Sequence, residues 1–144
     1  MASTTAARSL LAANINDNTS ADITPAEVRA VFTALLDLVD ELSAKPVVTK
    51  TASYTATVAE DMTLFAMNSA SANTFTVPAA APVGWECAVF QLGAGQTTIA
   101  ATGGALRNPD SHTKTAKQYA LVYLKVYANA GNAPQVIVTG DTAL

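Results

Sequence analysis

The chain has 144 residues, enough for one domain with a hydrophobic core and a short appendage. Charged residues make up 13% of the chain, the net charge is −3, and the eight Lys and Arg residues are scattered, which argues against a direct nucleic-acid interface. The single cysteine, Cys87, excludes an internal disulfide, and its neighbours in ECAVFQL indicate a buried small hydrophobic side chain.

The N-terminal segment, residues 1–21, is rich in Ala, Ser, Thr and Asn and has few apolar side chains. It lacks the basic region and apolar run of a secretory signal, and no part of the chain approaches the roughly 18 apolar residues of a membrane helix. We therefore expect an arm that is disordered or docked onto another protein, in a chain made and folded in a cytoplasm with no membrane partner.

The next segment, residues 22–45, carries the signals of a single helix. Thr24 can cap it, Pro25 fits the first helical position, and Glu27 completes a capping box three residues after the cap. Pro46 stands just past the other end. These signals predict a helix over about residues 25–44.

A heptad seam of apolar residues runs along this helix: Val28, Val31, Leu35, Leu38 and Leu42. Phe32 and Val39 lie beside the seam and widen it. An isolated helix of this length is marginal in water, so the apolar side must be covered, either by the β-domain of the same chain or by helices of neighbouring copies. The widened seam favours a bundle of more than two helices, because each helix then contacts two neighbours. The predicted oligomer interface is Val28, Val31, Phe32, Leu35, Leu38, Val39 and Leu42.

From Val47 onward the apolar pattern alternates with a period of two, as in β-strands. We expect about eight strands with short turns over residues 47–144, in a mainly β fold: a compact antiparallel β-sandwich or barrel. The longest predicted strand, KQYALVYLKVYA, has an aliphatic face and a second face with Tyr119, Tyr123, Tyr127 and Lys125.

Candidate catalytic groups are few. His112 is the only histidine, so a metal site built on several histidines is excluded, and its position beside Asp110 and Ser111 in a polar loop indicates a solvated side chain. No predicted strand presents the carboxylate pair that sugar cleavage requires, and neither glycine-rich turn has the pattern of a phosphate loop. We expect no catalysis and no cofactor.

Four segments together resemble a known family. DNTSADITPAEVRAVFTALLD (residues 17–37), NSASANTFTVP (68–78), VFQLGAGQTTIAA (89–101) and KQYALVYLKV (117–126), followed by Gly140-Asp141, occur here in the order and spacing found in structural proteins of tailed-bacteriophage virions. The chain departs from that pattern in lacking a tryptophan before the last strand. The resemblance covers roughly residues 16–141.

The resemblance implies a non-enzymatic virion structural protein, made in the host bacterial cytoplasm, from the family of head fibres, capsid decoration proteins and tail-fibre modules. Such proteins are commonly trimers with helices along a threefold axis. We therefore expect a homotrimeric head fibre or capsid decoration protein, anchored through residues 1–21 to virion proteins such as the major capsid protein.

Two alternatives stay open. One is a tail-fibre or receptor-binding component. The other is a carbohydrate-binding module that recognises a host-surface glycan through an aromatic platform. The residues of that platform would be Tyr54, Trp85, Tyr119, Tyr123 and Tyr127.

Overall fold

The computed structural model describes residues 25–43 and 46–144, with the helix side chains described from residue 26 to residue 40. The chain divides into two units, residues 1–45 and 46–144, which we treat separately. The predicted arm, the Thr24 cap and the side chain of Leu42 lie outside the described residues.

The helix α2 spans Pro25–Ser43, within one residue of the predicted range. Pro25 opens it because proline has no N–H to lose at a position where that group has no helical partner. Glu27 places a negative charge in the first turn, where the helix dipole is positive. The helix ends ahead of Pro46, since proline disfavours a helical conformation in the residue before it.

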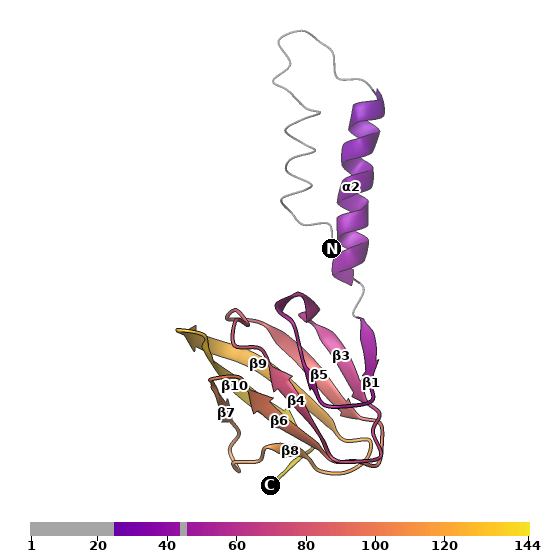
Figure 1. Cartoon of the computed structure of the whole chain (residues 1–144). Helices are drawn as coiled ribbons and strands as arrows, with labels where there is room; N and C mark the ends of the chain where they lie inside the picture. Colours follow the sequence, from indigo (N-terminus) through magenta and orange to yellow (C-terminus); the bar gives the residue numbers. More distant parts are fainter. Residues whose placement is uncertain (1–24, 44–45) are drawn as a thin grey trace. The chain divides into compact units, whose positions relative to one another are not determined.

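The second unit consists of two β-sheets (Figure 1). In the described part of the chain, one sheet has six strands in the order β1-β3-β5-β9-β10-β7 and the other has five in the order β11-β8-β6-β4-β2. A 3-10 turn, η1 (Val58–Glu60), follows β2. The strands are β1 (Val47–Lys50), β2 (Tyr54–Thr55), β3 (Thr63–Met67), β4 (Asn73–Val77), β5 (Glu86–Gln91), β6 (Thr97–Ala101), β7 (Ala105–Arg107), β8 (Lys114–Thr115), β9 (Leu121–Ala130), β10 (Ala133–Gly140) and β11 (Thr142–Ala143).

The mainly β class is confirmed, but the expectation of an antiparallel sandwich or barrel is wrong in part. Strands β1, β3 and β5 are mutually parallel, as are β2, β4 and β6, and β7 runs parallel to β10. The reason is that odd and even strands alternate between the sheets, so the early short connections cross to the opposite sheet instead of reversing within one. The described strands leave open edges at β1, β7, β11 and β2, so no barrel closes.

A tight hairpin does join β9 to β10, where the pairing is antiparallel. Its central residues, Gly131 and Asn132, both have positive φ, at 63° and 60°. This is the conformation of the two-residue turn whose twist matches that of paired strands, and glycine and asparagine are the residues that tolerate it best.

The hydrophobic core lies between the two sheets. Phe65 of β3 and Phe75 of β4 face each other across it, with ring centroids 4.8 Å apart. The alternation predicted for the longest strand is confirmed, because Val122, Leu124 and Val126 are fully buried while the tyrosines of β9 point away from the core. The rest of the cluster is mainly aliphatic, together with Trp85 and Cys87.

The glycines of the VFQLGAGQTTIAA segment are required by a close backbone approach. A Cβ on Gly95 would lie 2.0 Å from the carbonyl oxygen of Ser71, and one on Gly93 would lie 2.2 Å from that of Ser69. Backbone hydrogen bonds also join the two turns, including one from Gly95 N–H to Ser69 O at 2.8 Å. This motif and NSASANTFTVP therefore meet in the fold, which gives both a structural role.

Candidate functional site

The first candidate surface is the apolar side of α2. Phe32 and Leu36 are 58% and 62% exposed, which is unusual for large apolar side chains. Val28, Leu35 and Val39 are also exposed. Of the predicted interface residues, Val31 and Leu38 are only half-buried, and the side chain of Leu42 lies outside the described residues.

These side chains form two adjacent stripes along the helix. Val31, Ala34 and Leu38 are the half-buried apolar residues, spaced three and four positions apart. Beside them run Val28, Phe32, Leu35 and Val39 with the same spacing. Leu36, which is not among the predicted interface residues, widens this second stripe. An apolar surface two stripes wide suits contact with two neighbouring helices.

The second candidate surface, which we call the outer sheet face, is the side of the six-stranded sheet that points away from the core. Its exposed apolar side chains are Leu121, Tyr123, Tyr127 and Ile137. Lys125 lies among them and is paired with Glu86, with Nζ and Oε2 2.9 Å apart. The strand β9 therefore has large nonpolar groups on both faces, whereas a sheet with one solvated face usually alternates apolar and polar residues.

The five-residue aromatic platform does not form. Trp85 is 1% exposed and belongs to the core, while Tyr54 is half-buried and packs on Phe65. Tyr123 and Tyr127 share the outer sheet face, and Tyr119 stacks on Phe90 at a centroid distance of 6.2 Å. The aromatic groups diverge because Trp85 lies two positions before Cys87 and so shares the inward-facing alternation of β5, whereas Tyr123 and Tyr127 point outward from β9.

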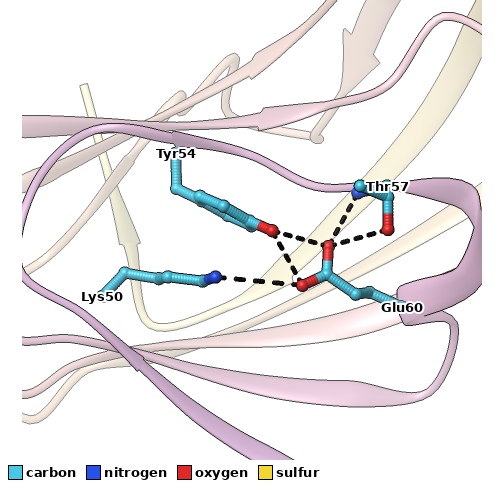
Figure 2. A network of polar contacts seen from close by, with 4 residues as sticks. All are labelled: Lys50, Tyr54, Thr57 and Glu60. Carbon is cyan, nitrogen blue, oxygen red and sulfur yellow. Dashed lines mark hydrogen bonds and ion pairs between the residues drawn. The ribbon is translucent and has the colours of Figure 1, made fainter.

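A polar cluster joins β1, β2 and η1 (Figure 2). The carboxylate of Glu60 accepts hydrogen bonds from the Tyr54 hydroxyl at 2.8 Å, the Thr57 N–H at 2.8 Å and the Thr57 hydroxyl at 3.1 Å. Lys50 Nζ lies 3.9 Å from Glu60 Oε1, the oxygen that accepts the 2.8 Å bond from Tyr54, and 3.4 Å from the centroid of the Tyr54 ring. The ammonium group thus has both an ion pair and a cation–π contact.

This environment fixes the charge of Glu60. Burial favours the neutral carboxyl group, but the hydrogen bonds from Thr57 and Tyr54 and the charge of Lys50 outweigh it, so the pKa of Glu60 is lowered. A carboxylate with a lowered pKa and this many donors is a poor general base. The cluster therefore has a structural role: it links β1, β2 and η1 through Glu60, and we call it the Glu60 clamp.

A groove with a volume of about 730 Å³ lies beside β7, β10 and the loop of residues 108–113. His112 lies in the loop, as expected, but its side chain is half-buried instead of fully solvated, and its Nδ1 lies 3.1 Å from Thr142 Oγ1. Arg107, which the sequence reading did not single out, lines the same groove. Arg107 contacts Gln135 and His112 contacts Thr142, in each case about 30 residues later in the chain. No local sequence pattern therefore indicates that Arg107 and His112 line one groove.

The remaining reactive group, Cys87, is buried as its apolar neighbours indicated. Burial, together with the nearby charges of Asp61, Glu60 and Glu86, raises the pKa of its thiol. The thiol therefore stays protonated and unreactive. Among residues 25–43 and 46–144, no group of three or more His, Cys, Asp or Glu side chains could hold a metal ion.

Within the same described ranges, no helix combines the length and the apolar character that crossing a membrane requires. Comparison of the chain with protein-family models, with curated proteins and with solved structures finds no match.

Proposed function

We propose that this chain is a non-enzymatic structural protein of a bacteriophage virion, a trimeric head fibre or capsid decoration protein whose copies associate through α2. In this arrangement residues 1–21 anchor the protein to other virion proteins, such as the major capsid protein, and the β-domain is displayed. The virion assignment rests on the resemblance of the four sequence segments. The association rests on the physical chemistry of the helix.

The observation that carries the association is the exposure of five large apolar side chains on one helix of 19 residues. Burying one such side chain completely contributes about 1.5–3 kcal/mol, so covering five that are about half exposed contributes roughly 5 kcal/mol per chain. Three chains together gain roughly 15 kcal/mol, which is comparable to the roughly 8–30 kcal/mol that two association steps cost in lost translational and rotational freedom. The two adjacent stripes favour three copies over two, since each helix then has a neighbour for each stripe.

The outer sheet face supports association as well. Tyr123 and Tyr127 are 48% and 46% exposed, and at that exposure each ring presents roughly 100 Å². Lys125 and Glu86 on this face neutralise each other, and Arg107 of β7 lies in register with Ile137 at its edge. A surface of this kind is suited to contact with another protein.

The test of association is the solution mass of the full chain at micromolar concentration, measured by light scattering after gel filtration. We expect about three times the 14.8 kDa of one chain. In the double variant Phe32→Glu/Leu35→Glu the mass should fall to that of one chain, because charge would have to be buried between helices. Glutamate is a good helix former, so the helix itself persists.

The matched control is Ala30→Glu/Thr33→Glu, which adds the same charge at the same spacing on the exposed polar side of α2. It should retain the mass of the native protein. A native protein that is already monomeric at micromolar concentration would rule out association through the helix.

The virion role has its own test. Particles assembled in the bacterial host should carry the full chain, and deletion of residues 1–21 should remove it from them while leaving the number of chains in the oligomer unchanged. The alternatives are separated by location and by site: a receptor-binding tail-fibre component should be found on the tail, and a carbohydrate-binding module should bind a glycan array through the exposed Tyr123 and Tyr127. Presence on the capsid supports the decoration role.

A further inference from the structure

We propose that the groove beside β7, β10 and residues 108–113 binds an acidic sugar, that is, a carboxylate carried on a hydroxyl-bearing ring. This site lies within the β-domain, and its lining shares Ile137 with the outer sheet face. The groove is lined by Leu106, Arg107, Asn108, Pro109, Ser111, His112, Thr113, Ile137, Val138 and Thr139.

The loop that forms one wall is held in place before any ligand arrives. Asn108 Oδ1 accepts hydrogen bonds from the N–H groups of Asp110 at 2.9 Å and His112 at 3.1 Å. Its Nδ2 donates to Val138 O at 3.0 Å, which fastens the loop to β10. Ser111 adopts a φ of 60°, a conformation that costs energy in a non-glycine residue and persists only where the surroundings impose it. A wall fixed in this way loses little entropy on binding.

The charge of the groove is positive although the chain is acidic overall. Its ionisable lining residues are Arg107 and His112, and no carboxylate lines it. Arg107 Nη2 donates to Gln135 Oε1 at 2.7 Å, which orients the guanidinium group without neutralising it. In the described part of the chain, the ion pairs are Lys50–Glu60 and Lys125–Glu86, so Arg107 keeps its charge for a ligand. A guanidinium group has five N–H donors and matches a carboxylate with two parallel hydrogen bonds.

The rest of the lining selects the body of the ligand. Leu106, Pro109 and Ile137 supply an apolar surface, and Ile137 is 39% exposed there. The hydroxyl groups of Thr113 and Thr139 have no hydrogen-bond partner among the described residues and can both donate and accept. A sugar ring fits this combination because it has C–H groups on its faces and hydroxyls around its edge. The volume is also within the range of about 300–1,000 Å³ common for small-molecule sites.

The experiment uses the full chain without a histidine tag, so that His112, the only histidine, gives one Hε1 resonance in the proton NMR spectrum. The probes, at constant pH, are methyl glucuronide, the neutral methyl glucoside and inorganic phosphate. We expect a saturable shift of the His112 resonance with the glucuronide, and dissociation constants at least about tenfold higher for the other two probes, which lack either the charge or the ring.

Arg107→Gln should weaken glucuronide binding at least about tenfold, because the charge-assisted hydrogen bonds to the carboxylate are lost. The matched control, Lys117→Gln, removes the same charge from an exposed position outside the groove and should bind as the native protein does. The proposal is overturned if no probe gives a saturable shift, if the glucoside or phosphate binds as tightly as the glucuronide, or if Arg107→Gln and Lys117→Gln bind equally.

Discussion

A buried hydrogen-bond network around Thr115 connects strands β5, β6 and β8, and we expect its removal to be costly. Thr115 is 0% exposed, and its hydroxyl donates to Gln91 Oε1 and accepts from the N–H of Thr97 at 3.0 Å. Gln91 Nε2 in turn donates to Gly93 O at 3.3 Å, in the turn after β5. The network therefore joins both sheets at the VFQLGAGQTTIAA motif.

The substitution Thr115→Val keeps the shape of the side chain and removes only the hydroxyl chemistry. It leaves Gln91 Oε1 and the Thr97 N–H buried without their partner. Each of the two unsatisfied buried groups costs about 1–3 kcal/mol, so the free energy of unfolding should fall by about 2–6 kcal/mol. This is a large fraction of the roughly 5–15 kcal/mol that stabilises a typical domain.

The assay is urea unfolding followed by the fluorescence of Trp85, the only tryptophan, which reports on the β-domain core. All variants are compared at one protein concentration, since association affects apparent stability. The control is Thr98→Val on the opposite face of β6, which should change stability by no more than about 0.5 kcal/mol. If Thr115→Val unfolds at the same urea concentration as this control, the hydroxyl is not a necessary part of the network.

Two further substitutions probe the Glu60 clamp and the close turn. Glu60→Gln should cost about 1–2 kcal/mol at pH 7, because hydrogen bonds to a charged group are stronger than those to a neutral one. The folded-state pKa of Glu60 is lowered from 4.5, so its contribution is present at neutral pH and lost as the pH falls through that lowered value. Thermal unfolding should therefore show a gap between native protein and variant that narrows below pH 4.5; a gap constant down to pH 3 would contradict this reasoning. Gly95→Ala should cost about 3 kcal/mol or more in urea unfolding, because its Cβ would meet the Ser71 backbone. Gly131→Ala is the comparison, because its Cβ would have open space and its φ of 63° costs alanine only about 1–2 kcal/mol; equal costs would show that the turns separate easily.

Local signals in the sequence determined the elements that depend on neighbouring residues. Pro25 and Pro46 bound the helix, because the constraints that proline imposes act within one or two positions. Alternation along β9 placed its aliphatic side chains and its tyrosines on opposite faces, because successive side chains in a strand point to opposite faces, and the structure buries the aliphatic face. The burial of Cys87 followed from its apolar neighbours in the same way.

Only the tertiary structure decided which strands pair and which polar groups meet. Short turns do not specify whether the chain reverses within a sheet or crosses to the opposite one, so the parallel pairing of β1, β3 and β5 could not be foreseen. The groove likewise depends on contacts of Arg107 with Gln135 and of His112 with Thr142, across about 30 residues of chain. Periodicity in the sequence constrains the direction of each side chain. Which residue that side chain contacts depends on the packing of the whole domain, and that packing determines where a site can form.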